Sequence, residues 1–308
     1  MKNLLRVYLC NIPNALFLLL LILVAAIPGR LAERSAVKPA GAFLVLILAA
    51  ELFYLIRLRG ANKRAAKDVA AFVFSLLIAW ELVTAKLDAL RYIFLPPPEN
   101  VFYVYVEQGR VVLGGFGRSM LLLTSGFFSA LFLGVLLGII IGSTRRLRDA
   151  VFPIVKAIST VPALIYTPYV VVLMPTFASA SVLVIFLGIF WSTLMNTIND
   201  VGTVDQRILD SAKILNVKVP VMVHRVLLPY LLPRIINSLT VQLTVSVMTL
   251  TAAEMIGANV GMGYFVRRSL DYANYAQALA GIFFIAVVIS ALNALILRLK
   301  KRVVKWRY

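Results

Sequence analysis

The stretch "ILDSAKILNVKVPVMVHRVLLP", Ile208 to Pro229, lies between two long apolar runs of the chain. It is charged, interrupted by one proline and closed by another. Apolar residues recur in its first half at helical spacing, which predicts a short amphipathic helix that begins near Asp205. They are Ile208, Leu209, Ala212 and Leu215.

Two residues then favour a turn and a second short helix. Asn216 tolerates the left-handed conformation that commonly ends a helix, and Pro220 suits the first turn of the next one. We call residues 205–229 the elbow segment. Its apolar stripe fits either a helix lying on a membrane surface or a helix inserted into a groove of a soluble partner. The spacing alone leaves both open.

The composition around this segment is that of a membrane protein. The 308 residues are 61% hydrophobic and 14% charged, with a mean hydropathy of +0.93, whereas soluble domains are roughly 45–50% apolar. Apolar stretches of about 20 residues, enough for a helix to cross a bilayer, recur along the chain. We therefore predict an all-α polytopic membrane protein with eight spans, at 12–28, 40–58, 69–90, 119–142, 154–174, 180–199, 235–257 and 277–297.

The positive charge supports a topology rather than a nucleic-acid partner. The 31 Lys and Arg residues exceed the 13 Asp and Glu residues, and they gather in short loops between apolar runs. With the N-terminus inside, 21 of them lie on the cytoplasmic side and nine on the other. The positive-inside rule then predicts both termini, and the elbow segment, in the cytoplasm. The lone Cys10 and the absence of a Cys/His cluster predict no disulfide, metal or cofactor.

The N-terminal part of the chain is set apart by composition. Lys2 and Arg6 precede the first apolar run as in a signal peptide, but no small-x-small cleavage site follows, so we expect an uncleaved anchor. The proline-rich stretch "LPPPENVF" (95–102) separates three predicted spans from the five that follow.

The elbow segment resembles the cytoplasmic "EAA" loop of ABC-importer permeases, whose pattern is E-A-A-x3-G-x9-I-x-L-P. The spacing is kept, with Asp210, Ser211, Ala212, Asn216, Val226, Leu228 and Pro229 at the patterned positions. Three further stretches resemble the nitrate, sulfonate and taurine branch of that family, in the same order along the chain. They are "LPPPENVF" (95–102), "VDQRILDSAKILN" (204–216) and "AAEMIGANVGMGYFV" (252–266).

This resemblance covers residues 69–302 and implies a type I ABC importer permease fold. It implies a six-helix core at 69–302 containing a coupling loop at 200–233. Residues 1–68 would then be an extension with two extra transmembrane helices, and 303–308 a cytoplasmic tail.

The resemblance also implies the function: a permease subunit of an ATP-driven importer in a bacterial inner membrane, surrounded by lipid. Its partners would be a separate ATPase, an extracytoplasmic substrate-binding protein and a second permease subunit, usually an identical one. The substrate would be a small anion or organic solute of the nitrate, sulfonate and taurine class. The residues that would contact the ATPase are Ile208, Leu209, Asp210, Ser211, Ala212, Leu215, Asn216, Leu228 and Pro229.

Departures from this pattern and one absence refine this expectation. Asp210 shortens the carboxylate and Asn216 replaces glycine, so we expect a dedicated ATPase with a matching groove. The chain contains no G-x-x-x-x-G-K-[ST] stretch, so ATP hydrolysis would belong to the partner and this subunit would be no enzyme. The alternative is an ion-coupled secondary transporter or channel that acts without an ATPase, with Glu51 and Glu81 coupling ions.

Two polar stripes are candidates for the translocation path. Ser192, Asn196 and Asn199 share one face of the span at 180–199, and a second stripe runs along 235–257, with Asn237, Thr240, Thr244 and Thr251. Hydrogen bonding between neighbouring helices explains such residues equally well. Neither stripe carries a charge, so we expect an anionic substrate to meet dipoles rather than a fixed cation.

Three other patterns predict local roles. Small residues at every fourth position, Gly126 to Gly142, favour close helix packing within the subunit or across a dimer. Prolines at 162 and 168 predict a kinked or partly unwound span. Buried carboxylates are functional candidates in membranes: Glu254 is assigned to an outer gate, whereas Glu51 and Glu81, placed near mid-span, would form either a proton relay or a structural hydrogen bond.

Overall fold

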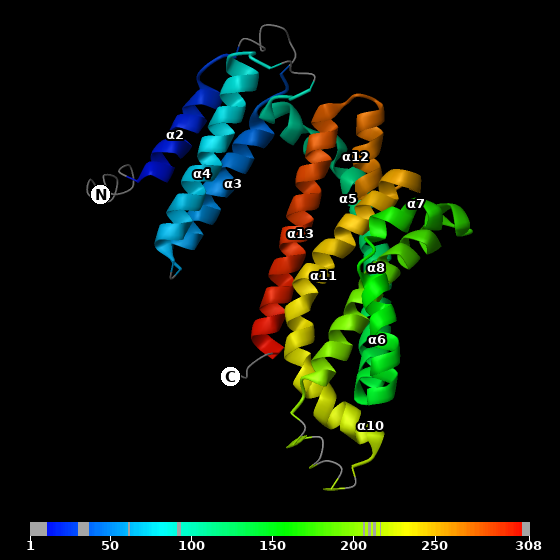
Figure 1. The fold of residues 1–308 in the computed structure, drawn as a ribbon. Helices are drawn as coiled ribbons and strands as arrows, with labels where there is room; N and C mark the ends of the chain where they lie inside the picture. Colours follow the sequence, from blue (N-terminus) through cyan, green and yellow to red (C-terminus); the bar gives the residue numbers. More distant parts are fainter. Residues whose placement is uncertain are drawn as a thin grey trace. The chain divides into compact units, whose positions relative to one another are not determined.

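We describe a computed structural model of the chain over residues 11–29, 37–60, 62–90, 94–205, 207–208, 211, 214–215 and 217–303. All regular structure in these residues is helical, which confirms the all-α prediction (Figure 1). The α-helices are α2 (Ile12–Ala25), α3 (Gly41–Leu58), α4 (Lys63–Glu81), α5 (Pro98–Ser143), α6 (Arg145–Ser159), α7 (Ala163–Leu173), α8 (Phe177–Gly202), α10 (Val219–Met222), α11 (Leu228–Gly257), α12 (Met262–Asp271) and α13 (Tyr275–Val303). Two π-helical turns, η2 (Leu82–Lys86) and η3 (Val223–Leu227), precede a loop and α11 respectively.

Six helices within the described ranges are long and apolar enough to cross a membrane, or seven if the bent pair α6 and α7 counts as one span. The helix α2 has 14 residues and so extends about 21 Å, less than the roughly 30 Å of a hydrocarbon core. The predicted span 12–28 is therefore shorter in the structure, and the described residues do not show eight crossings.

The chain forms two compact units, which we describe separately. One comprises Met1–Val112 and Val266–Ile282, and the other Leu113–Phe265 and Phe283–Tyr308. The division falls inside α5 and does not coincide with the predicted boundary at residue 68. The predicted boundary at residue 68 marks where the resemblance to the family begins, whereas the division in the structure marks which residues pack together.

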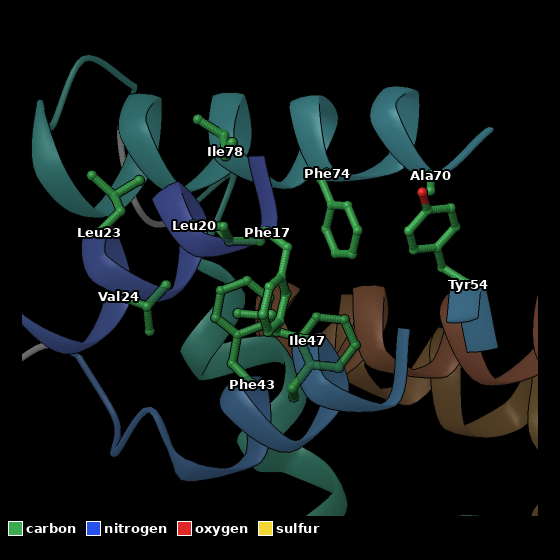
Figure 2. Close-up of a cluster of buried hydrophobic side chains, with 11 residues drawn as sticks. Phe17, Leu20, Leu23, Val24, Phe43, Ile47, Tyr54, Ala70, Phe74 and Ile78 are labelled. Carbon is green, nitrogen blue, oxygen red and sulfur yellow. The ribbon is translucent and has the colours of Figure 1, made fainter. Parts of the chain in front are cut away.

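In the first unit, α2, α3 and α4 pack around a common apolar core (Figure 2). Phe17 and Leu20 of α2 meet Phe43 and Ile47 of α3, with Phe74 of α4 beside them. Because the apolar residues recur every three or four positions on each helix, one face of each is buried and the other remains free for lipid.

Glu81 is fully buried at the last residue of α4, rather than near mid-span as predicted. Its carboxylate lies 3.1 Å from the ammonium of Lys86 in η2, and this ammonium also donates to the carbonyl oxygen of Ile27 at 2.7 Å. The ion pair therefore ties the end of α4 to the segment that follows α2. Glu51 is buried in the middle of α3.

In the second unit, α5 packs against α8 through its small residues. A Cβ atom added at Gly126, Gly134, Gly138 or Gly142 would lie 2.5–2.9 Å from side-chain atoms of Ile185, Thr193, Thr197 and Val201. Ala130 is fully buried on the same face. Of the two predicted roles, packing within the subunit and packing across a dimer, the structure thus shows the first for this face.

Other spans differ from their predicted limits. The helix α5 begins at Pro98, about 20 residues before the predicted span 119–142, with one non-helical residue at Gln108. The predicted kink is confirmed, because α6 and α7 are bent by 87° and Pro162, in an extended conformation, precedes α7. The helix α12 has one apolar and one charged face and was not predicted.

Candidate functional site

A polar cavity of 410 Å³ lies between the C-terminal half of α8 and the N-terminal half of α11. These two helices run side by side in the second unit (Figure 1). Nine of its ten lining residues are polar: Thr193, Asn196, Thr197, Asn199, Asp200, Arg234, Asn237, Ser238 and Gln242, with Ile235 the exception. On each helix they recur at intervals of three and four residues, so one polar face of α8 meets one polar face of α11.

The cavity contains only part of the predicted translocation path. Asn196, Asn199 and Asn237 line it together, although they come from the two separate stripes. Ser192, Thr240, Thr244 and Thr251 do not line it. The hydroxyl of Ser192 instead bonds to the backbone carbonyl of its own helix four residues earlier.

Two of the remaining stripe residues form hydrogen bonds within α11. The hydroxyls of Thr244 and Thr251 donate to carbonyl oxygens four residues before them. Thr244 also accepts a hydrogen bond of 3.2 Å from the side-chain amide of Asn293 in α13. The hydrogen-bonding alternative therefore explains Thr244, which joins α11 to α13.

Two buried polar atoms on the cavity lining have no hydrogen-bond partner among the described residues. They are the hydroxyl oxygen of Thr193 and the side-chain carbonyl oxygen of Gln242, whose residues are 2% and 6% exposed. Buried polar groups are nearly always satisfied by protein or by water. The cavity is therefore suited to water or to a hydrogen-bonding solute.

The cavity also contains an ion pair, although we expected an uncharged lining. One terminal nitrogen of Arg234, Nη1, donates to Oδ1 of Asp200 at 3.1 Å, and it also donates to the hydroxyl of Thr203. The guanidinium lies 5.6 Å from the ring centroid of Tyr230, close enough for a cation–π interaction. The sequence pattern missed this pair because Arg234 and Asp200 are 34 positions apart and Arg234 was counted with the cytoplasmic loop charges.

The elbow segment directly joins the two helices that line the cavity. Leu209, Asp210, Ala212 and Asn216, four of the predicted ATPase contacts, lie outside the described residues. Ile208 and Leu215 are 40% and 75% exposed, and Ile214, which was not predicted as a contact, is 81% exposed. Ser211 is exposed, and its hydroxyl donates to the carbonyl oxygen of Arg207 as in a helix.

The second half of the elbow segment is anchored to the helical core. Pro220 occupies the first turn of α10, as predicted. Leu227 of η3 is 2% exposed and packs with Ile139, Val201 and Leu231. Leu228 is half-buried against the same cluster, whereas Pro229 is exposed. The segment thus combines an apolar exposed first half with a second half that is fixed to α5, α8 and α11.

Glu254 is fully buried near the end of α11 and holds the start of α12. Its carboxylate accepts hydrogen bonds from the Ser119 hydroxyl at 2.5 Å and from the Gly263 amide at 2.7 Å. The Ser119 oxygen in turn accepts from the Met262 amide at 2.9 Å. Because the first amides of a helix have no partner within it, Glu254 and Ser119 together satisfy the N-terminus of α12.

Gly261 makes this arrangement sterically feasible. Its φ of +151° is rarely adopted by residues with a side chain. A Cβ atom at this position would also overlap the Glu254 carboxylate. The "AEMIGANVGMG" part of the sequence therefore encodes a buried carboxylate and a glycine turn that are fitted to each other.

Comparisons with known proteins agree with this architecture. Residues 130–307 match the family described as "Binding-protein-dependent transport system inner membrane component". A permease protein of Bacillus subtilis (strain 168), named for aliphatic sulfonate transport, is 26% identical over 82% of this chain and 92% of its own length. The taurine transport system permease protein TauC of Escherichia coli (strain K12) is 27% identical over 80% and 91%. The nitrate import permease protein NrtB of Leptolyngbya laminosa is 26% identical over 82% and 92%.

A solved structure shows the same fold. The inward-facing MetNI methionine ABC transporter matches 65% of this chain and 99% of its own chain with a TM-score of 0.57 at 18% identity. The family match covers more than half of the chain, and the fold is that of an importer permease, as the resemblance of the elbow segment predicted. The chain therefore belongs to the family of binding-protein-dependent transport system inner membrane components, and it is a multi-pass permease subunit of an ABC importer.

Proposed function

We propose that this permease imports a small oxyanion, inorganic or organic, through the cavity between α8 and α11. One observation carries the proposal: the two helices that line this cavity are the two that the elbow segment joins. A force applied to the elbow segment therefore acts on the cavity walls without an intermediate element. The relatives named for sulfonate, taurine, nitrate and bicarbonate transport support the substrate class, because each of these solutes carries an oxyanion group.

The energy comes from an ATPase partner, which membership of the family implies. The exposed apolar side chains of Ile208, Ile214 and Leu215 form the contact surface for a groove on that ATPase. When the ATPase closes on ATP, it moves the elbow segment, and the buried Leu227 transmits this movement to the helices around it. Glu254 acts at the opposite end of α11 as part of an outer gate, because it sets the position of α12.

The other partners follow from the same proposal. A substrate-binding protein delivers the solute on the outer side, and a second copy of this chain completes the path. Both termini and the elbow segment lie in the cytoplasm of a bacterial cell, with the chain embedded in the inner membrane. The charge asymmetry of 21 cytoplasmic to nine outer Lys and Arg residues supports this orientation.

Cysteine crosslinking tests the contact with the ATPase. Cys10 is replaced by serine, and a single cysteine is introduced at Leu215 in the full complex in native membranes. We expect crosslinking to the ATPase from Leu215→Cys. The control is Val172→Cys in α7, a position that is 83% exposed but distant in sequence from the elbow segment. Equal capture of the ATPase from both positions, or capture from Val172 alone, would contradict the proposed contact.

Uptake by reconstituted vesicles tests transport itself. Vesicles that contain the permease and its ATPase, with the binding protein and labelled taurine or nitrate outside, should accumulate one of these anions only when ATP is present on the ATPase side. Accumulation without ATP would favour the alternative of an ion-coupled transporter instead.

A further inference from the structure

The cavity contains an unusual arrangement around a single cation. Both hydrogen bonds that Arg234 donates to described residues come from one nitrogen, Nη1. The guanidinium group has five N–H donors in a plane, and its Nε and Nη2 nitrogens form the edge that binds carboxylate, sulfonate or phosphate oxygens in pairs. In the described part of the chain, no hydrogen bond uses that edge.

The surroundings of Arg234 hold it in one orientation. Asp200 and Thr203 engage Nη1 from the end of α8, and Tyr230 lies one turn before Arg234 with its ring 5.6 Å from the guanidinium carbon. These contacts fix the plane of the group, and among the described residues none engages its second edge. A lysine could not replace it, because an ammonium is a point charge without a paired edge.

The charge balance of the pair fits transient binding. Asp200 neutralises much of the field of Arg234, and the two side chains are 26% and 41% exposed, so water screens what remains. An isolated buried cation would retain an anion, which would block a path. An arginine that is already paired attracts an anion weakly and recognises it mainly by the geometry of two parallel hydrogen bonds.

We propose that the free Nε and Nη2 edge of Arg234 is the anion-recognition element of the cavity, and that Asp200 is a positioning residue that orients it and limits its affinity. The ligand class is a small monoanion that carries at least two oxygens on one central atom, such as a sulfonate. The unpartnered hydroxyl of Thr193 and the side-chain NH2 groups of Asn196 and Asn237 can donate further hydrogen bonds to its oxygens. This inference rests on the proposed function, since it concerns the same cavity.

Charge-selective labelling tests the inference independently of transport. Cys10 is replaced by serine, and Ser238→Cys places a thiol on the cavity wall of the full-length detergent-solubilised complex. Two methanethiosulfonate reagents of similar size are compared, one carrying a sulfonate and the other a trimethylammonium group. The ratio of their labelling rates reports the field at the cavity, and competition by millimolar methanesulfonate reports binding.

Substitutions of the ion pair should shift this ratio in opposite directions. We expect Arg234→Gln to lower the anionic-to-cationic ratio by about tenfold and to abolish protection by methanesulfonate. Arg234→Lys should keep most of the ratio but lose the protection, because the charge remains and the paired edge does not. Asp200→Asn, a second variant that retains Arg234, should raise the ratio. Arg145→Gln, an exposed basic residue of α6 outside the cavity, is the matched control and should leave both readouts unchanged.

A wild-type ratio in Arg234→Gln, or a lowered ratio in Asp200→Asn, would overturn the inference. A purely structural role for Arg234 predicts equal loss of labelling by both reagents, and this result would overturn it as well. Labelling requires neither ATP nor a binding protein. Vesicles that show no ATP-driven uptake therefore refute the proposed function, whereas an unchanged labelling ratio refutes only the assignment of Arg234.

Discussion

Replacing Gly138 by alanine tests the close packing of α5 against α8. The added Cβ would lie 2.5 Å from Cβ and 2.8 Å from Cγ2 of Thr197, whereas carbon atoms in contact are normally about 3.5–4.0 Å apart. The two helices must therefore separate by roughly 1 Å, and overpacking of this kind costs about 1–3 kcal/mol. Alanine also gains about 1 kcal/mol of helix propensity over glycine, which partly masks that cost.

A matched control removes the propensity effect. Gly117 lies in the same helix, and a Cβ there meets nothing within 4 Å. Gly117→Ala should therefore be neutral or stabilising, and the unfolding free energies of the two variants should differ by about 1–3 kcal/mol. The assay is denaturant unfolding of the full-length protein in mixed micelles. The double variant Gly138→Ala/Thr197→Gly should recover part of the loss, because it removes the Thr197 side chain that the new Cβ atom would overlap. If Gly138→Ala is as stable as Gly117→Ala, these two helices do not pack as described.

The same unfolding assay checks three further substitutions. Glu254→Leu should cost at least about 1–3 kcal/mol, because it leaves the α12 amides and Ser119 without their acceptor; stability equal to wild type would contradict the capping role. Gly261→Ala should also destabilise through its positive φ and its overlap with Glu254, while Gly117→Ala again serves as the control. Lys86→Met should cost about 3–5 kcal/mol, because it removes the cation beside the buried Glu81 carboxylate, and Glu81→Gln in the same chain should restore part of that loss. A double variant no more stable than Lys86→Met would refute the pairing.

The features that depend on regular spacing could be predicted from the sequence. The glycine repeat of α5 has a period of four residues, which places every member on one helix face, and the structure confirms its close packing. Pro162 predicted the break between α6 and α7 because proline cannot continue a helix without loss of a hydrogen bond. The elbow segment combined a periodic stripe with proline and asparagine turns, and its resemblance to a known loop identified the family.

The features that depend on tertiary contact could not be predicted in the same way. Asp200 and Arg234 approach each other only because α8 and α11 run side by side, and nothing in their local sequence pairs them. Glu254 was assigned to an outer gate from its own helix, but its partners Ser119 and Gly263 lie on other elements that the local sequence does not identify. Thr244 joined its stripe by spacing alone, and its hydrogen bond to Asn293 of α13 depends on a contact that the spacing does not give.

The turn η3 and the helix α11 form one uninterrupted rod from Val223 to Gly257. About 31 residues separate its start from Glu254, which corresponds to roughly 47 Å at 1.5 Å per residue. A pivot near one end by only 10° would therefore displace the other end by about 8 Å. One continuous helical segment therefore connects the elbow segment to the Glu254 carboxylate that caps α12. The two ends can move together without a series of side-chain contacts between them.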